Sequence, residues 1–441
     1  MPTTLSASEA AAAIRSGKLT SVELVQQCID RIEALEDTVC AWTFFDPVHA
    51  LRQAREADRL RLANAPLGAL HGVPVGIKDI FDTRDMPTEN GTVLHAGRTP
   101  VEDAAVVALL RAAGAVIMGK TVTTELAVYS PGKTRNPRDP GHTPGGSSSG
   151  SAAAVAAEMV PLAIGSQTNG SIIRPAAYCG VHGYKPTRGL VSLYGALAQS
   201  GPLDTIGMFA RSIEDLALVA EQLMVYDGRD PNQRPRARAV LTDIVAQQPP
   251  TPPRIAFVKT PVWPKADAET QEAFTRFAQE LGSQVTEVGL PDYFDKAIDC
   301  HGAIMLPDLA KSFAGEYERG RDQLSTILRN MIEDGQRRLA VDYNIALEQA
   351  ERFYQYLRQI FALYDVILTP ATTGTAPRGL AATGSPMFCT LWTLTGTPAI
   401  SLPLLKGANG LPLGVQLVAA RGDDARLLRT ARWLVKHAIA N

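Results

Sequence analysis

Two short turns rich in glycine, serine and threonine carry the residue types that nucleophilic catalysis requires. The first turn covers 145–151 and reads GGSSSGS, and the second covers 168–171 and reads TNGS. Glycine lets the backbone turn sharply and approach a substrate closely, and serine supplies an attacking oxygen when a base lies beside it. Successive backbone N–H groups in the second turn can form an oxyanion hole. The pattern indicates acyl transfer through a serine.

No histidine adjoins either turn in the sequence, and a neutral lysine could serve as the base instead. Lys78 lies in the apolar stretch GVPVGIKD, which is expected to form a strand over 71–80. Burial disfavours the charged amine and lowers its pKa, so a buried lysine can accept a proton. The alternative is a lysine at a strand end whose amine reaches water. Asp79 is expected on the opposite face of the strand and is not assigned as a partner of Lys78.

These motifs resemble those of the amidase signature family, from about residue 6 to the C-terminus and most closely over 71–79, 119–211 and 396–418. That family uses a Ser–Ser–Lys triad in which one serine follows a cis peptide bond. The resemblance implies Ser171 as the nucleophile, Ser147 as the cis-serine and Lys78 as the base. The oxyanion would bind the backbone N–H groups of Thr168, Asn169, Gly170 and Ser171.

The nucleophile motif departs from the family's common pattern, Asp-Thr-Gly-Gly-Ser-Ile-Arg. Gln167 stands in place of the aspartate, Asn169 in place of a glycine, and Arg174 lies one position later. This version resembles the malonamidase-type branch, in which the shifted arginine binds a substrate carboxylate. A guanidinium suits bidentate binding of a carboxylate, but Arg174 could equally tie the turn to neighbouring carbonyls or carboxylates.

The expected function is hydrolysis of C–N bonds in small amides, anilides or carbamates (urethanes), with ester cleavage as a side activity. Arg174, Tyr129 and Gly146 are the candidate substrate-binding residues, although an aromatic such as Tyr129 more often belongs to the core. A malonamate-type hydrolase and the glutaminase subunit of an amidotransferase are the alternatives within the family. A non-catalytic binding protein that keeps the fold is the alternative outside enzymes.

Two other motifs are rejected by their surroundings. Residues 146–150 match the G-x-S-x-G nucleophile elbow around Ser148, but that motif follows a strand directly, whereas a proline-rich loop precedes it here. Gly145 and Gly150 have the spacing of a phosphate loop, yet Ser151 and Ala152 stand where lysine and serine or threonine are needed. The histidines form no close ligand pair, so we expect neither a metal nor another cofactor.

Composition and net charge argue against several other classes of function. The chain has 441 residues and a net charge of −2, which provides no basic field for nucleic acid or an anionic membrane. Its five cysteines include no CxxC pair, which argues against a disulfide framework. No apolar run is long enough for a membrane span, and no secretion signal begins the sequence. These features favour a cytoplasmic enzyme with a small-molecule substrate, and a homodimer is the candidate assembly.

The elements that must position the two turns alternate between helix and strand. A helix is expected over 151–158 and a strand over 160–165, between the serine turns. Lys120 follows an expected buried strand at 115–119 and is expected at the surface. Alternation of this kind predicts an α/β fold: one domain over 1–441, with a twisted mixed β-sheet covered by α-helices. Residues 225–350 are expected to form a variable, mainly helical cap within that domain, beginning with a β-α-β unit over 254–288.

Overall fold

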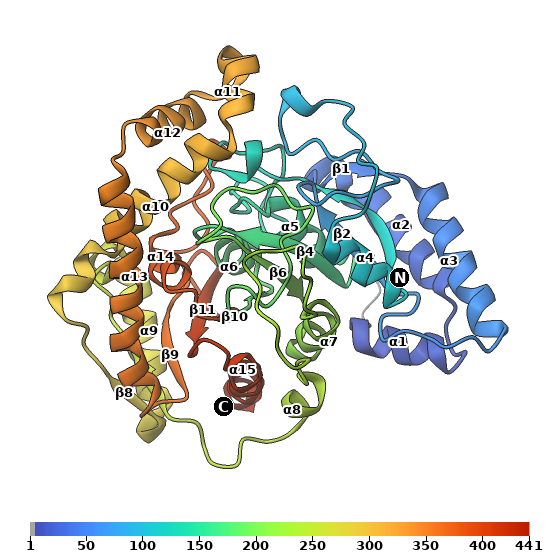
Figure 1. The fold of residues 1–441 in the computed structure, drawn as a ribbon. Coiled ribbons are helices and arrows are strands. Elements are labelled where there is room, and N and C mark those ends of the chain that lie inside the picture. The colour runs from blue at the N-terminus through green and yellow to red at the C-terminus, as the bar shows by residue number, and fades with distance from the viewer. Residues whose placement is uncertain (1–4, 441) are drawn as a thin grey trace.

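The structure is a computed structural model that describes residues 5–440. Its centre is one mixed sheet of eleven strands in the order β1-β3-β2-β4-β6-β5-β10-β11-β9-β7-β8, with helices on both faces (Figure 1). The strands are β1 (Trp42–Phe45), β2 (Pro74–Lys78), β3 (Val116–Thr121), β4 (Leu162–Gln167), β5 (His182–Lys185), β6 (Thr205–Ala210), β7 (Ile255–Phe257), β8 (Val285–Glu287), β9 (Val366–Pro370), β10 (Ala399–Lys406) and β11 (Pro412–Val418). The predicted α/β class and helix-covered mixed sheet are confirmed.

Three buried clusters attach the helices to the sheet. One face of the sheet packs against α1 (Ala7–Arg15), α4 (Ala105–Ala112), α7 (Ile213–Leu223), α8 (Thr242–Ala246), α9 (Ala268–Glu280) and α15 (Asp424–Ala440). The other face packs at one end against α2 (Ser21–Val39), α3 (Pro47–Leu62), α5 (Ser149–Ala156) and α6 (Ile173–Cys179). At its other end it packs against α10 (Ala297–Ser312), α12 (Thr326–Gln336), α13 (Ala340–Phe361) and α14 (Met387–Leu394).

Alternating side chains explain why both faces of the strands are apolar. In β4, Ile164 belongs to the cluster on one face and Ala163 to the cluster on the other. Successive strand residues point to opposite faces, so a strand covered on both sides needs an uninterrupted apolar run. The runs that the sequence shows at 74–78 and 162–167 are therefore central strands, buried on both faces.

The strand order brings the two chemical motifs to one edge of the sheet. β2 and β4 are parallel neighbours, and their carboxyl ends are Lys78 and Gln167. Carboxyl ends of neighbouring parallel strands lie at the same edge, where open α/β sheets commonly bind ligands. The turn 168–171 therefore begins beside the end of the strand that carries Lys78.

Residues 225–350 supply part of the sheet as well as helices. β7 and β8 pair in parallel at the edge of the sheet, and α9 connects them, as the predicted β-α-β unit requires. Beyond them, α10, α11 (Ala314–Gly320), α12 and α13 lie at the end of the molecule opposite α1, α2 and α3 (Figure 1). That 225–350 acts as a cap remains a prediction.

The prediction that Lys120 lies at the surface is wrong. Its side chain is fully buried, and Nζ lies 3.2 Å from Asp79 Oδ1. The amine also donates to the carbonyl oxygens of Phe81 and Pro87 and to Thr88 Oγ1, so each of its hydrogens has an acceptor close by. Lys120 is part of β3, which continues to Thr121 past the expected end of the strand, and the chain that follows β2 covers it.

Within residues 5–440, no helix is both long enough and apolar enough to cross a membrane. Over the same residues, no group of three or more His, Cys, Asp or Glu side chains is placed to hold a metal ion.

Candidate active site

Lys78 is a buried amine with hydroxyl partners. Its side chain has 0% exposure, and Nζ lies 2.7 Å from Ser147 Oγ and 2.9 Å from Ser166 Oγ. Among the described residues, no carboxylate forms an ion pair with it. Burial lowers the pKa of Lys78 well below its usual value, and the charge of Asp204 opposes that shift only in part. A lysine in this environment favours its neutral, proton-accepting form.

Ser147 reaches this amine because α5 packs very closely on the sheet. The peptide bond between Gly146 and Ser147 is cis, as the resemblance implied. Ser147 lies one residue before Ser148, the N-cap of α5, and the helix consists of small residues. A Cβ at Gly150 would collide with the carbonyl oxygen of Ala41 and the amide of Val122. Glycine at that position lets the start of α5, and Ser147 with it, approach the end of β2.

Ser171 lies on the turn between β4 and α6 and is 7% exposed. Gln167, the last residue of β4, accepts hydrogen bonds through Oε1 from the amides of Ile172 and Ile173 and so caps the start of α6. No hydrogen bond joins the Ser171 hydroxyl to Ser147 or to any other described residue. Hydrogen bonds of a catalytic centre often tighten only when substrate binds, so Ser171 remains the candidate nucleophile.

The four backbone N–H groups of Thr168, Asn169, Gly170 and Ser171 donate to no acceptor among the described residues. Most buried N–H groups in proteins are paired. Four consecutive N–H groups without an acceptor are therefore available to bind an acceptor atom of a ligand, such as a developing oxyanion.

Polar side chains hold this turn from several sides. Thr168 Oγ1 donates to Asp204 Oδ1 at 2.6 Å, and the second oxygen of Asp204 accepts from the amides of Gln199 and Ser200. Burial raises the pKa of Asp204 to about 6, against the lowering effect of these bonds. His301 on α10 lies 2.9 Å from the carbonyl oxygen of Thr168, and burial lowers the pKa of that imidazole to about 4.

The guanidinium of Arg174 is fully buried and bonded to backbone carbonyls. Nε and Nη2 donate to the carbonyl oxygen of Gly146 at 3.2 and 2.7 Å, and Nη1 donates to that of Gly384 at 2.5 Å. Arg174 therefore joins the start of α6 to the cis peptide and to the loop before α14. All three guanidinium nitrogens are engaged in these bonds.

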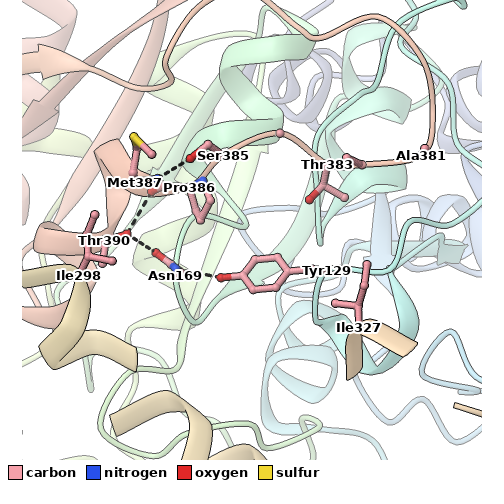
Figure 2. A pocket seen from close by; sticks show the side chains of 12 residues that line it. Tyr129, Asn169, Ile298, Ile327, Ala381, Thr383, Ser385, Pro386, Met387 and Thr390 are labelled. Carbon is pink, nitrogen blue, oxygen red and sulfur yellow. Dashed lines mark hydrogen bonds between the residues drawn. The ribbon is translucent and has the colours of Figure 1, made fainter. Parts of the chain in front are cut away.

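A cavity of about 430 Å³ adjoins the turn (Figure 2). Its lining combines apolar side chains with a few hydroxyls and amides from five separate segments: Tyr129, Asn169, Ile298, Ile327, Ala381, Ala382, Thr383, Gly384, Ser385, Pro386, Met387 and Thr390. None of these lining residues carries a charge. Ile298 on α10 and Ile327 on α12 are large apolar side chains that remain 42% and 45% exposed.

Tyr129 lines this cavity beside the turn, and a hydrogen bond joins its hydroxyl to Asn169 (Figure 2). Asn169 Nδ2 donates to Tyr129 Oη at 2.9 Å, and Asn169 Oδ1 accepts from Thr390 Oγ1 at 2.8 Å. The guanidinium carbon of Arg174 lies 6.0 Å from the centroid of the Tyr129 ring. Phe388 and Trp392, two aromatic residues of the neighbouring α14, are buried in the core.

The structure thus brings Lys78 beside Ser147, Arg174 beside Gly146, and Tyr129 beside Asn169. Sequence reasoning missed Ser166, Asp204, His301 and Thr393, which contact the lysine or the turn. Ser166 alone carried a usable signal, because it precedes Gln167 on the strand that leads to the turn. The other three lie 36 to 224 positions from their partners on the turn, and no motif marks them.

Comparisons by family model, by sequence and by structure each find proteins that are similar to nearly the whole of this chain. A family model described as Amidase matches residues 23–428. A glutamyl-tRNA(Gln) amidotransferase subunit from Chloroflexus aggregans is 34% identical over 466 residues, which covers 96% of this chain and 94% of the relative. A native peptide amidase from Stenotrophomonas maltophilia superposes with a TM-score of 0.86 at 28% identity, covering 99% of this chain and 97% of the other. A chain from a vestigial complex linked to the origins of an s-triazine catabolic enzyme reaches a TM-score of 0.92 at 26% identity, covering 98% of each chain.

Proposed function

Since this chain belongs to the amidase signature family and is an enzyme that hydrolyses amide bonds, we propose that it cleaves small neutral amides and carbamates through an acyl-enzyme on Ser171. The observation that carries the proposal is the fully buried amine of Lys78, which lies 2.7 Å from Ser147 Oγ and has no carboxylate partner within residues 5–440. The partners of Lys78 are hydroxyls, which can exchange protons with it, whereas the buried Lys120 pairs with a carboxylate and the buried Lys185 donates to backbone carbonyl oxygens.

In the proposed mechanism, neutral Lys78 takes the proton of Ser147 while Ser147 takes that of Ser171. Ser171 Oγ then forms a bond to the substrate carbonyl carbon, and the resulting oxyanion accepts hydrogen bonds from the free amides of the turn. Collapse breaks the C–N bond, and the proton held on Lys78 returns through Ser147 to the leaving nitrogen. Water attacks the acyl-enzyme by the same proton route and releases the acid.

The lining of the cavity supports a neutral, largely apolar substrate. The cavity offers no charged side chain to a bound molecule, and an ion transferred into such a site would lose its hydration without compensation. The half-exposed Ile298 and Ile327 would instead bury their apolar surface against a ligand. Anilides and aryl carbamates have this character.

The hydroxyl of Tyr129 has a hydrogen that it could donate to an acceptor on that substrate. Its hydroxyl oxygen accepts from Asn169 Nδ2, and its own hydrogen reaches no acceptor among the described residues. Burial raises the pKa of Tyr129, so the phenol keeps that hydrogen at neutral pH. The alkoxy oxygen of a carbamate is an acceptor that a simple amide lacks.

The malonamidase-type alternative assigns Arg174 to a substrate carboxylate. The three bonds from Arg174 to the carbonyl oxygens of Gly146 and Gly384 favour the other role, in which the guanidinium ties the turn to neighbouring backbone. We therefore propose Arg174 and Gly146 as parts of the scaffold that holds Ser147, and not as a carboxylate site.

The glutaminase subunit of an amidotransferase is the second candidate, because a relative 34% identical to this chain is named as an amidotransferase subunit. Glutamine carries an α-ammonium and an α-carboxylate, and a site for it needs charged partners. The uncharged lining of the cavity favours hydrolysis of neutral amides over glutamine.

A substrate panel tests these alternatives. Malonamate, glutamine, a neutral anilide and an aryl carbamate would each be incubated with the enzyme and with Ser171→Ala, and the released amine or ammonia measured. We expect turnover of the anilide and the carbamate by the wild-type enzyme alone. Selective turnover of malonamate or glutamine would overturn the neutral-substrate proposal, and equal turnover by Ser171→Ala would overturn the acyl-enzyme.

A further inference from the structure

Each of three successive carbonyl groups in the turn has a donor of its own. The carbonyl oxygen of Thr168 accepts from His301 Nε2 at 2.9 Å, and that of Asn169 accepts from Thr393 Oγ1 at 2.5 Å. The carbonyl oxygen of Gly170 accepts from the amide of Arg174 at 2.9 Å. The donors come from α10, α14 and α6, which are far apart in the sequence.

These bonds determine the directions of the amides that follow. A trans peptide unit is planar, and its N–H points away from its C=O. Holding the carbonyl groups of Thr168 and Asn169 therefore orients the N–H groups of Asn169 and Gly170. Those N–H groups donate to no described acceptor, so their directions are set by bonds made on the other side of each peptide plane.

His301 is suited to act as a fixed hydrogen-bond donor. It is 3% exposed, and burial lowers its pKa to about 4, which keeps the ring neutral near neutral pH. A neutral imidazole that faces a carbonyl oxygen through Nε2 must carry its hydrogen there. Ile298, one turn earlier on α10, lines the cavity, so the same helix contributes to the cavity wall and supports the turn.

Thr393 is the centre of a second set of bonds. Its hydroxyl donates to the carbonyl oxygen of Asn169 and accepts from Gln167 Nε2 at 2.9 Å. Gln167 in turn holds the amides of Ile172 and Ile173. Thr393 therefore couples the middle of the turn to the start of α6, on either side of Ser171.

We propose that His301 and Thr393 are positioning residues that pre-organise the oxyanion hole by holding the carbonyl side of two of its peptide units. The inference rests on the proposed acyl-enzyme at Ser171. Donors that are already oriented stabilise the transition state without reorganisation, and loss of one oxyanion donor costs about 10²–10³ in kcat. Loss of the donor that holds a carbonyl group, with the amide of the oxyanion hole itself retained, should lower kcat roughly 10–100-fold.

The test compares Thr393→Val, which keeps the shape but loses the hydroxyl, with Thr393→Ser, which keeps the hydroxyl. The readouts are kcat and KM for a neutral anilide and the affinity for an aryl trifluoromethyl ketone, which mimics the tetrahedral oxyanion after adding Ser171 Oγ. Thr393→Val should lower kcat and the ketone affinity by similar factors, roughly 10–100-fold, with KM within about threefold. Thr393→Ser should restore both quantities to within about threefold of wild type.

A second pair, His301→Leu and His301→Gln, keeps the inference testable if Thr393→Val does not fold. Glutamine retains an N–H donor and should preserve more activity and ketone affinity than leucine. Unchanged ketone affinity in Thr393→Val and His301→Leu, or equal losses within each pair, would overturn the inference. Labelling of Ser171 by a fluorophosphonate separates the two hypotheses: an unlabelled wild-type Ser171 overturns the acyl-enzyme and the inference with it, whereas normal labelling with unchanged ketone affinity overturns the inference alone.

Discussion

Two buried lysines should respond in opposite ways to the same substitution. Both side chains are 0% exposed. Lys120 pairs with Asp79 at 3.2 Å and donates to three further oxygens, whereas among the described residues the amine of Lys78 forms hydrogen bonds only with the hydroxyls of Ser147 and Ser166. Methionine is similar in length and carries no charge, so Lys78→Met and Lys120→Met separate loss of a base from loss of an ion pair.

For Lys78→Met, we expect loss of activity with little loss of stability. Removing a general base costs about 10²–10⁴-fold in rate, which corresponds to about 3–5 kcal/mol in activation free energy. Two hydrogen bonds to hydroxyls are lost, each with a net value of about 1 kcal/mol. Relief from burying an ionisable amine offsets that loss, because burial disfavours the charged form.

For Lys120→Met, we expect the reverse. The buried carboxylate of Asp79 loses its counter-charge, and removal of one partner of a buried pair costs about 3–5 kcal/mol in the free energy of unfolding. The folded fraction should keep near-normal kcat, because Lys120 touches neither serine turn.

The assay combines steady-state turnover of the anilide between about pH 6 and 9 with thermal unfolding of each variant. A Lys78→Met enzyme that keeps more than about a tenth of the wild-type kcat would refute the base assignment. A fall in Tm as large as that of Lys120→Met would show that Lys78 is primarily structural.

Four further outcomes are expected. Ser171→Ala should lose at least about 10³-fold in kcat with an unchanged Tm, since triad members act as a unit; a smaller loss in the turnover assay would contradict the nucleophile. The kcat/KM of the wild-type enzyme should rise with pH along a limb centred well below 10.5, because burial lowers the pKa of Lys78 and only the neutral amine accepts a proton; a limb centred near 10.5 would contradict this. Arg174→Met leaves two carbonyl oxygens without donors, so it should lower the Tm and reduce any turnover of anilide and malonamate by similar factors; a loss confined to malonamate would restore the carboxylate role. Tyr129→Phe should lower kcat/KM for an aryl carbamate about 3–10-fold and leave a matched anilide nearly unchanged, and equal losses on both would argue against a hydrogen bond to the alkoxy oxygen.

Much of the fold followed from local pattern. The apolar run at 74–78 and the alternation around the serine turns are properties of adjacent residues, and both reappear as strands and helices of the sheet. The cis bond before Ser147 came from the resemblance, not from local pattern.

What could not be predicted depends on contacts between distant segments. Lys120 follows a typical end-of-strand sequence, and only the path of the chain from Phe81 to Thr88 across it makes it buried. His301 and Thr393 reach the turn from positions 133 and 224 residues away, on helices that have no motif in common with it. The orientation of Arg174, which the sequence left open, depends on a carbonyl at Gly384, 210 positions later.

The strand order also has a consequence for the synthesis of the protein. β10 and β11 lie inside the sheet, between β5 on one side and β9 on the other. The ribosome completes residues 399–418 last among the strands, so β7, β8 and β9 cannot join the earlier strands until that hairpin emerges. Non-local pairing of this kind slows folding and leaves strand edges exposed in the meantime. A nascent chain would therefore hold two separate parts of the sheet, of six and three strands, until β10 and β11 emerge, and each part would expose an unpaired strand edge during that interval.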